Sequence, residues 1–397
     1  MNKIILKSGP QEFIHKNWNT DILSLLLKNP IFEGVSQQEL VEQLEAKKKC
    51  QKKLPTWFTT LGIYYPNKLN IEQASSERTA MYKTRLVKGT TLLDMTGGIG
   101  IDSYYFSKKI ERVTHCELNT NLSEIAAHNF STLGASNCTF IAQDGIQFLE
   151  TQHQEFDWIY IDPSRRPHHK GKVFRLEDCE PNVILHLNLL FKHTNEILIK
   201  ASPLLDLTNA IRTLSNVSQI HIVAIENEVK EVLLLLTKNY ESNVKVVTIN
   251  IKKEKEEHFE FLHEQEMPLL EYEMPQNYLY EPNAAILKSG GFNKIPEHYQ
   301  VKKLAVHSHL YTSEQNVEFP GRVFKIEEVI AYSKKNMKRF LRTKANVTTR
   351  NFPETVALLR KKYQIQDGGE CYLFFTQDKT KNKIVIKCTK VKDHKAI

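Results

Sequence analysis

The sequence contains no uninterrupted apolar stretch of about 18 residues, the length at which a membrane-spanning helix becomes a candidate. The N-terminal segment MNKIILKSGPQEF turns polar before it could form the apolar core of a signal peptide. Cysteine is also scarce: the six cysteines show no C-x-x-C spacing and fit neither a disulfide framework nor a zinc knuckle. These absences predict a cytoplasmic protein with reduced thiols, no membrane segment and no metal.

At 397 residues the chain is too long for one compact core, so several domains are expected. The net charge of +8 is unevenly distributed along it. From Arg322 to the end, 19 Lys or Arg stand against 7 Asp or Glu, which leaves the preceding residues net negative. This local excess predicts a polyanionic partner, with nucleic acid favoured over membrane, although a solvated lysine-rich surface is the alternative.

Hydrophobic periodicity divides the chain into helical and α/β parts. Apolar positions at helical spacing, including one continuous amphipathic helix over 69–86, predict a helical region over 1–85. From 86 to 240, short apolar strands alternate with helices, as in a parallel sheet. The closing runs at 220–225 and 231–237 are too close for a crossover helix and predict an antiparallel hairpin. This α/β pattern predicts a Rossmann-like, seven-stranded sheet of the class I methyltransferase layout, with strands at Leu92–Met95, Arg112–Cys116, Thr139–Ala142, Trp158–Ile161 and Glu196–Lys200.

The C-terminal part is predicted to contain small α+β modules. Residues 241–320 are expected to form a linker and a small module, with the charged run IKKEKEEHFEF as an edge strand or linker. Residues 321–397 are expected to form a basic module. In it, MKRFLRTK and PETVALLRKKY are expected to be helices, and ECYLFFT and KIVIKCT strands.

A buried strand ends in Asp94 and leads into the glycine loop MTGGIG at the start of a helix. Glycine permits close approach of the backbone to a ligand, and the start of the helix offers amide donors to an anion. Phosphate and a methionine carboxylate both fit this description, but the carboxylate of Asp94 repels a pyrophosphate and attracts an ammonium group. The dinucleotide fingerprint G-x-G-x-x-G also fails, because Ser103 occupies its third glycine position. A nicotinamide-dependent oxidoreductase is therefore disfavoured.

Acidic residues follow four successive predicted strands. Glu117 is placed to accept from ribose hydroxyls, and Asp144 from the amino group of adenine. Each acid alone is more often a helix cap, but four of them at the carboxyl edge of one sheet predict a site for S-adenosylmethionine. The expected cofactor residues are Asp94, Thr96, Gly97, Gly98, Gly100, Asp102, Glu117, Leu118, Asp144 and Gly145.

The segment IYIDPSRRP supplies the expected reaction site, at Asp162, Pro163, Ser164, Arg165 and Arg166. Asp162 can orient a hydrogen of the methyl acceptor, and Pro163 stiffens the turn. Methyltransferases that act on the amino groups of flipped bases usually carry Pro-Pro-aromatic after this acid. The arginines here favour an acceptor with anionic oxygens, unless they pair with nearby acids.

Other candidates are weaker. Carbon-5 methylation of pyrimidines needs a cysteine nucleophile, and Cys179 lies far beyond the turn in sequence. Adjacent residues such as His168 and His169 seldom bind one metal ion together. The expected substrate-binding residues are Lys200, Arg342, Lys344, Arg350 and Arg360.

The motifs EQASSERTA, DMTGGIGID, DPSRR and KASP occur in this order, and with them the chain resembles bacterial class I methyltransferases that carry a C-terminal THUMP-like domain. YLYEPNAA is similar to the ferredoxin-like insert of that family, and ANVTTRNFP with DGGECYLF to its THUMP-like end. The glycine loop is also similar to that of guanine-N2 methyltransferases of ribosomal RNA. The resemblance implies a methyltransferase, and related THUMP modules bind RNA.

The sequence therefore predicts methylation of structured RNA, in rRNA or tRNA, at a base nitrogen. Methylation of a protein or of a small molecule is one alternative. A catalytically silent RNA-binding protein is another, although a silent site would not need acids at all four strand ends.

Overall fold

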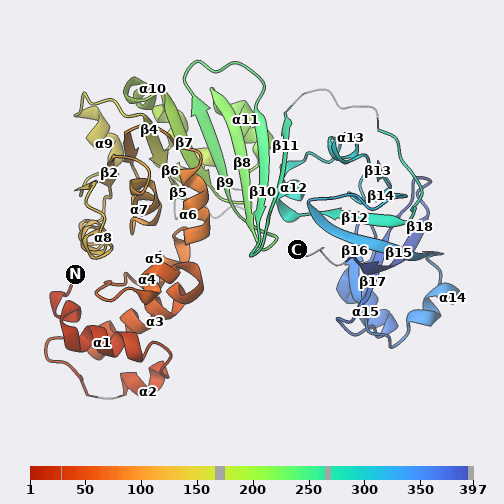
Figure 1. The fold of residues 1–397 in the computed structure, drawn as a ribbon, viewed down its shortest axis with the longest axis horizontal. Coiled ribbons are helices and arrows are strands. Elements are labelled where there is room, and N and C mark those ends of the chain that lie inside the picture. Colours follow the sequence, from red (N-terminus) through yellow and green to blue (C-terminus); the bar gives the residue numbers. More distant parts are fainter. Residues whose placement is uncertain (28, 166–174, 264–269, 392–397) are drawn as a thin grey trace. The chain divides into compact units, whose positions relative to one another are not determined.

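The computed structural model describes residues 1–27, 29–165, 175–263 and 270–391 (Figure 1). Among them, no helix has both the length and the apolar character that crossing a bilayer requires. The chain forms two compact units: the first contains Met1–Ile220 and Lys230–Ser242, and the second contains His221–Val229 and Asn243–Ile397.

The N-terminal residues of the first unit form helices, as predicted. Ser36 begins the longest helix with a capping box, in which its side chain and that of Glu39 each accept from the backbone amide of the other. The buried face of this helix, including Leu40 and Leu44, packs in one apolar core with Ile101 and Phe130 of the α/β part. The helices are η1 (Lys3–Leu6), α1 (Ser8–Lys16), α2 (Ile22–Leu26), α3 (Gln37–Lys53), α4 (Pro55–Thr59), α5 (Lys68–Gln73) and α6 (Glu77–Thr84).

The prediction of one continuous helix over 69–86 is wrong. The chain is extended at Ala74 and Ser76, so α5 and α6 are separate helices. Ser76 caps α6 by accepting from the amide of Thr79, while the Thr79 hydroxyl accepts from the amide of Ser76. Ser75, between the two helices, is buried. The break therefore brings a polar side chain inward where a regular helix would have continued.

The sheet of the α/β part contains nine strands where seven were predicted, because β10 (Lys245–Ile251) and β11 (Glu256–Leu262) extend it beyond β8. The other seven strands follow the order β3-β2-β1-β4-β7-β9-β8. Pairing is parallel from β3 to β7, and β9 runs antiparallel to β7. The strands are β1 (Thr91–Asp94), β2 (Arg112–Cys116), β3 (Cys138–Ile141), β4 (Trp158–Ile161), β7 (Glu196–Ala201), β8 (Val217–Ile225) and β9 (Glu228–Thr237). The helices are α7 (Ile101–Ser107), α8 (Thr120–Thr132), α9 (Gly145–Glu150), α10 (Val183–His193) and α11 (Leu207–Thr213).

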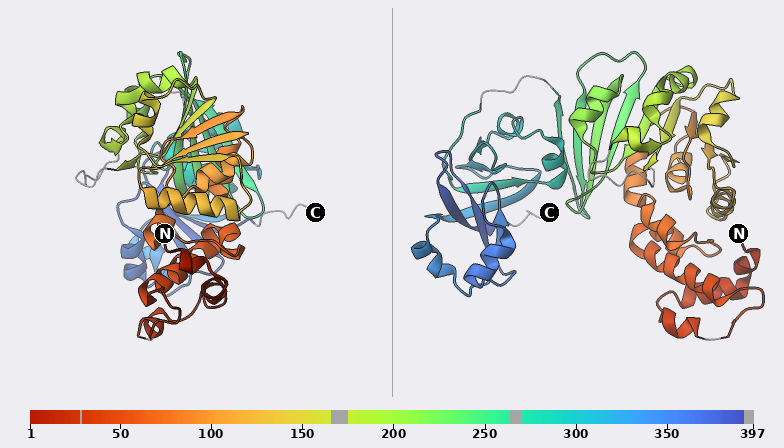
Figure 2. Two further views of the ribbon diagram at one scale, coloured as in Figure 1. Left: turned by 90° about the vertical axis from the view of Figure 1, so that its left-hand side faces the viewer. Right: turned by 180° about the vertical axis from the view of Figure 1, so that it is seen from behind.

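Central strands β1 and β4 are buried along their whole length, which explains their continuous apolar sequences. Figure 2 shows the strands of this unit with the N-terminal helices next to one end of them. Two further short strands, β5 (Ser164–Arg165) and β6 (Cys179–Glu180), pair antiparallel after β4. The η2 turn (Leu176–Asp178) precedes β6.

In the second unit, β10 (Lys245–Ile251) and β11 (Glu256–Leu262) form an antiparallel hairpin. β11 ends its sheet, which confirms the predicted edge strand. A separate seven-stranded sheet has the order β13-β14-β12-β15-β18-β17-β16. Its strands are β12 (Tyr278–Pro282), β13 (Lys302–Lys303), β14 (Tyr311–Ser313), β15 (Gly321–Ala331), β16 (Asn346–Thr349), β17 (Cys371–Gln377) and β18 (Lys383–Lys390). The helices are α12 (Ala284–Ser289), α13 (Ile295–Tyr299), α14 (Lys334–Met337), η3 (Lys338–Phe340) and α15 (Val356–Tyr363).

This second sheet continues across residue 320, where we placed a domain boundary. Strand β15 pairs with β12 on one side and with β18 on the other, so the modules before and after residue 320 share one sheet. The predicted helix MKRFLRTK is wrong in extent, because α14 ends at Met337, η3 follows and Arg342 has a positive φ of 56°. The predicted helix at PETVALLRKKY and the strands at ECYLFFT and KIVIKCT are confirmed by α15, β17 and β18.

Candidate functional site

A cleft of 1180 Å³ lies in the first unit at the carboxyl ends of β1, β2, β4 and β7, and α5 lines it as well. Ligands bind at this edge in open α/β sheets. The cleft brings together the residues predicted from separate strand ends. Its lining includes Asp94, Thr96, Gly97, Gly98, Gly100, Asp102, Glu117, Leu118, Asp144, Gly145, Asp162, Pro163, Ser164, Arg165 and Lys200.

The glycine loop needs its glycines for steric reasons. A Cβ atom at Gly97 would lie 2.2 Å from Nε2 of His115, which is buried directly behind the loop. Burial lowers the pKa of His115 to about 4, so the ring is neutral at pH 7. Gly100 begins α7 with a φ of 83°, and a Cβ atom there would lie 2.7 Å from Phe130. Side chains at either position would push the loop into the cleft.

Asp94 is a buried carboxylate that faces this cleft. Its side chain is 1% exposed and accepts hydrogen bonds from the amide of Thr96 and the hydroxyl of Ser103. Burial raises the pKa of Asp94 to about 7, with Asp102 and Asp162 adding to the increase and the two hydrogen bonds opposing it. A bound cation would therefore stabilise the ionised form of Asp94 strongly.

Glu117 connects the glycine loop to the end of β2. Its carboxylate accepts from the amide of Gly98 at 2.8 Å and from the amide of Asn119 at 2.7 Å. Each of its oxygens can accept more than one hydrogen bond, so the side chain can also receive hydroxyl groups of a ligand. Next to it, Leu118 is 72% exposed and lines the cleft, which places an apolar surface beside the polar one.

Asp144 does act as a helix cap, since its Oδ1 atom accepts from the amides of Ile146 and Gln147 at the start of α9. The same residue lines the cleft, and its second oxygen can serve a ligand there. Gly145 is required sterically, because a Cβ atom at this position would lie 2.7 Å from the carbonyl oxygen of Met95.

Asp102 lines the cleft, but its carboxylate is bound by other side chains of the protein. Its Oδ2 atom accepts from the hydroxyls of Ser75 and Tyr160 at 2.8 Å and 2.7 Å. Its Oδ1 atom lies 3.2 Å from Nζ of Lys83, which is fully buried and also contacts both carboxylate oxygens of Glu231. These contacts hold Asp102 in the lining of the cleft, and its role as a cofactor ligand stays a prediction.

Asp162 pairs with Lys200 across the ends of β4 and β7. The Nζ atom of Lys200 lies 2.5 Å from Oδ2 of Asp162, and the amide of Asp162 donates to the hydroxyl of Thr96. Burial lowers the pKa of Lys200, but the carboxylates of Asp162, Asp102 and Glu231 outweigh it, so the pKa is raised above its ordinary value. Lys200 stays charged and holds Asp162 at the cleft, 37% exposed.

The turn after Asp162 continues into β5, where Arg165 pairs with Cys179 of β6. Cys179 is therefore a spatial neighbour of the turn, although the sequence suggested that it was remote. Its thiol is buried and does not line the cleft, and burial raises its pKa to about 11. Arg166, His168 and His169 lie outside the described residues. In the described part of the chain, no group of three or more His, Cys, Asp or Glu could hold a metal ion.

Several residues of the cleft were not predicted from the sequence. Asn70 and Gln73 come from α5, Lys230 comes from β9, Glu180 is the last residue of β6, and Pro181 follows it. The motif EQASSERTA contains Gln73, which is the one signal that pointed to this part of the helical region.

The predicted substrate-binding residues of the second unit have partners there. Arg350 donates to Glu281, whose side chain is 4% exposed and also pairs with Arg322. Arg360 pairs with Asp367. Both arginines thus pair with local carboxylates, and their role in substrate binding stays a prediction.

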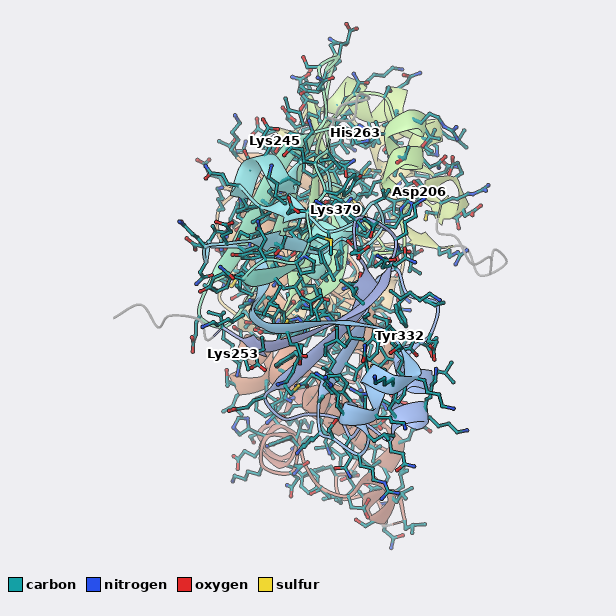
Figure 3. The ribbon with its side chains drawn as sticks, turned by 90° about the vertical axis from the view of Figure 1, so that its right-hand side faces the viewer. Asp206, Lys245, Lys253, His263, Tyr332 and Lys379 are labelled. Carbon is teal, nitrogen blue, oxygen red and sulfur yellow. The ribbon has the colours of Figure 1, made fainter. Side chains whose placement is uncertain are left out.

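Arg342 and Lys344 lie near the start of β16. Arg342 donates to the side chain of Gln364 at 2.9 Å, and Lys344 packs against Gly368 and Gly369. Tyr332, labelled in Figure 3, belongs to the same module and connects Glu354 with Lys362 through its hydroxyl.

Comparison with known proteins agrees with this architecture. A ferredoxin-like domain model matches residues 278–320, and a THUMP domain-like model matches 321–390. The crystal structure of a proposed methyltransferase from Porphyromonas gingivalis W83 is similar to the chain with a TM-score of 0.89 and 31% identity, over 98% of this chain and 99% of that one.

Two curated relatives are RNA methyltransferases by name. An uncharacterized RNA methyltransferase of Mycoplasma mobile is 26% identical over 47% of this chain and 54% of its own length. A tRNA (uracil(54)-C(5))-methyltransferase of Pyrococcus furiosus is 27% identical over 32% of this chain and 30% of its own length. The matches thus span about half or less of these relatives. The similarity along nearly all of both chains shows that the protein belongs to the family of the Porphyromonas gingivalis protein, class I methyltransferases with a ferredoxin-like and a THUMP-like domain.

Proposed function

We propose that the protein transfers a methyl group from S-adenosylmethionine to a base nitrogen of structured RNA. The observation that supports this best is the distribution of charge in the cleft. Asp94, Glu117 and Asp144 line it after β1, β2 and β3, while Lys200, Arg165 and Lys230 line it together with Asp162 and Glu180 at the other strands. A cationic sulfonium cofactor favours the first part and a polyanionic acceptor favours the second.

The cofactor half of the cleft fits S-adenosylmethionine group by group. Asp94 would accept from the ammonium group, and the amides of the glycine loop face the carboxylate. Glu117 would accept from the ribose hydroxyls, and Asp144 from the adenine amino group. The exposed side chain of Leu118 offers an apolar contact for the adenine ring. The bound cofactor supplies an electrophilic methyl group.

At the acceptor half, Asp162 would accept a hydrogen bond from the nitrogen that becomes methylated. Its ion pair with Lys200 holds the carboxylate in place. The hydrogen bond orients the nitrogen lone pair toward the methyl carbon, and this positioning accounts for most of the rate enhancement. Pro163, which is buried, and Ser164 shape the turn, and Arg165 would contact an anionic oxygen of the acceptor.

A base nitrogen is favoured over carbon 5 of a pyrimidine because carbon-5 transfer requires a cysteine nucleophile. Among the described residues, none of those that line the cleft is a cysteine. Cys179, the nearest candidate in the turn, is buried with a raised pKa, so little thiolate would be present. For this chain we therefore do not propose the carbon-5 methylation of uracil that the name of the Pyrococcus furiosus relative states.

RNA is favoured as the acceptor because the THUMP-like match coincides with the basic C-terminal segment, and both curated relatives bear the name of RNA methyltransferases. Because we propose RNA as the substrate, we also propose that the protein is located in the cytoplasm.

The test is to incubate the full chain with S-adenosylmethionine carrying a tritiated methyl group and with total RNA from a strain that lacks the protein. Nucleosides are then separated and identified by mass spectrometry. We expect label in one N-methylated nucleoside, and none with the variant Asp94→Ala. Label in protein or in small molecules, with none in RNA, would contradict the proposal.

A further inference from the structure

A stacked pair of aromatic rings lies in the ferredoxin-like module of the second unit. The ring centroids of Phe292 and His309 are 3.6 Å apart, and the two rings are inclined by only 26°. Both residues are partly exposed, so the stack reaches the surface of the module. A planar stack at the surface is a place where a further planar group can pack.

The surrounding backbone holds this stack in a fixed position. The loop before His309 is closed by the buried side chain of Ser308, whose hydroxyl accepts from the amide of Ala305 and donates to its carbonyl oxygen. The hydroxyl of Tyr311 donates to the carbonyl oxygen of Phe292 at 2.8 Å. His309 itself has a φ of 49°, a left-handed conformation that costs free energy for a residue with a Cβ atom. The imidazole ring is thus already ordered, which reduces the entropic cost of binding a ligand there.

Two arginines share one buried carboxylate in the same unit. Arg322 and Arg350 both pair with Glu281, whose side chain is 4% exposed. The two arginine side chains are 38% and 32% exposed, so they reach the surface while the carboxylate does not. Two cations against one carboxylate leave a net positive charge, and Glu281 orients both of them. Guanidinium groups oriented in this way are suited to bind a phosphate.

Strand pairing brings the stack and the arginines to the same end of β12. Tyr311 of β14 pairs with Tyr280 of β12, and Glu281 follows Tyr280. Because these strands are antiparallel, His309, which precedes Tyr311 by two residues, lies toward the end of β12 that carries Glu281. The aromatic stack and the arginine pair are therefore close together in the second unit.

A third cation lies beside the stack. The Nζ atom of Lys303 is 6.0 Å from the centroid of the Phe292 ring and donates to the side chain of Asn293 at 3.2 Å. Burial, with a smaller contribution from the positive charges of Lys303 and Arg350, lowers the pKa of His309 to about 4. The imidazole is therefore neutral at pH 7 and lies in positively charged surroundings. A nucleotide complements both features, because it combines a planar base with a phosphate.

We propose, on the basis of the RNA substrate proposed above, that Phe292 and His309 stack with an unpaired base of the RNA and that Arg322 and Arg350 bind an adjacent phosphate. Stacking on an aromatic side chain tolerates any base, because every base has a planar face. Bases within a duplex are already stacked on one another and are not accessible to such a site. The proposal thus assigns the second unit to a single-stranded part of the RNA, such as a loop or an end.

The test measures binding of the full chain to a labelled single-stranded RNA of about 12 nucleotides and to the duplex of the same sequence. Fluorescence anisotropy is recorded over a range of salt concentrations, with S-adenosylhomocysteine present. His309→Ala removes one ring of the stack, and His309→Phe keeps an aromatic ring at this position. Arg350→Gln removes one charge and leaves Arg322 paired with Glu281. Thermal unfolding verifies that each variant is folded.

Two matched controls change the same residue types elsewhere. His258→Ala alters a half-exposed histidine of β11. Arg212→Gln alters an exposed arginine of α11 that contacts Asn209. Both controls should bind the two RNAs as the wild type does.

We expect His309→Ala to lower the affinity for the single strand about tenfold or more and to leave the affinity for the duplex unchanged. His309→Phe should retain the single-strand affinity of the wild type. Arg350→Gln should reduce the slope of log affinity against log salt concentration for the single strand by about 0.7, because one phosphate contact is lost. Unchanged single-strand affinity in His309→Ala, an equal loss for single strand and duplex, or an unchanged slope in Arg350→Gln would overturn the site.

The methylation assay described above separates this inference from the proposed function. If RNA is methylated but single-strand binding depends on neither His309 nor Arg350, the stacking site is wrong and the function stands. If RNA receives no methyl group while single-strand binding depends on both residues, the RNA methylation is wrong and the stacking site stands.

Discussion

The substitution Asp94→Asn removes a buried negative charge while keeping the shape of the side chain. Its amide oxygen can still accept from the amide of Thr96, and its NH2 group can donate to the hydroxyl of Ser103. The substitution therefore isolates the effect of ionisation at a position that is 1% exposed.

The pH dependence of this effect follows from the raised pKa. In the unfolded chain the carboxyl group has its ordinary pKa of 3.8, and in the folded protein the pKa is about 7. Between these values the folded protein retains a proton that the unfolded chain has released, so stability falls as the pH rises. The loss is complete above about pH 7 and amounts to about 4 kcal/mol, because each pKa unit corresponds to about 1.4 kcal/mol. At about pH 5 it amounts to about 2 kcal/mol by the same relation.

Thermal unfolding without cofactor measures this difference. Asp94→Asn should melt above the wild type by about 5 °C at pH 5 and by about 10 °C at pH 8. Asp144→Asn is the control, because this carboxylate is partly exposed and asparagine is an equally good helix cap. It should show no gain that grows with pH. A gap between wild type and Asp94→Asn that stays constant from pH 5 to pH 8 would refute the assignment of the raised pKa to Asp94.

The same substitution should impair cofactor binding. Loss of a charge-assisted hydrogen bond to the ammonium group costs about 1.5 to 3 kcal/mol, so the affinity for S-adenosylmethionine should fall about 10- to 100-fold. Because an ammonium group favours the ionised carboxylate, the wild type should also release a proton on binding near pH 7, and Asp94→Asn should not. Calorimetry in two buffers of different ionisation enthalpy measures this release. If Asp94→Asn is more stable than the wild type but binds S-adenosylmethionine with unchanged affinity, the ammonium group does not bind at Asp94.

Further predictions concern the other parts of the cleft and the basic segment. Glu117→Ala should lower the affinity for S-adenosylmethionine about tenfold or more, as measured by calorimetry, because it removes the acceptor for the Gly98 amide and for the ligand. Unchanged affinity would contradict the assignment of Glu117 to the cofactor site. Asp162→Ala should reduce kcat on total RNA with little change in KM, whereas Arg165→Ala should mainly raise KM; wild-type kinetics for Arg165→Ala would make this arginine structural. RNA affinity of the full chain should fall steeply with salt in a filter-binding assay, and a flat dependence would rule out the basic segment as the phosphate-binding surface.

The sequence was most informative where function and local structure depend on the same few residues. Asp94 and the glycine loop were recognisable because a strand, an acid and a tight turn follow one another without interruption. The pairing of β8 with β9 followed from the short spacing between the two closing apolar runs. Parallel strands then brought Glu117, Asp144 and Asp162 to one edge, so a set of residues distant in sequence could be assembled correctly from strand ends alone.

Pairs that join distant parts of the chain were not predictable in this way. Lys83 and Glu231 are 148 residues apart, and neither occurs in a pattern that indicates a buried ion pair. Arg350 was interpreted as a surface residue for RNA because its charge is visible in the sequence, whereas its partner Glu281 lies in the preceding module. The break between α5 and α6 was missed because the apolar positions on either side keep helical spacing. The capping box that Ser76 forms with Thr79 is a weaker local signal in the sequence.

The buried charges below the cleft have a common physical explanation. Lys83 and Glu231 are fully removed from water, and such pairs seldom stabilise a fold as much as apolar residues of the same size would. Their value lies in position: Lys83 from α6 binds Asp102 from α7, which accepts from Tyr160 on β4, so the elements under the cofactor and acceptor sites are joined by directional contacts. Apolar packing alone would leave these elements freer to shift relative to one another. A transferase that depends on aligning a lone pair with a methyl group needs that rigidity. We infer that the buried charges of Asp94 and of this cluster lower the free energy of unfolding but keep the site rigid.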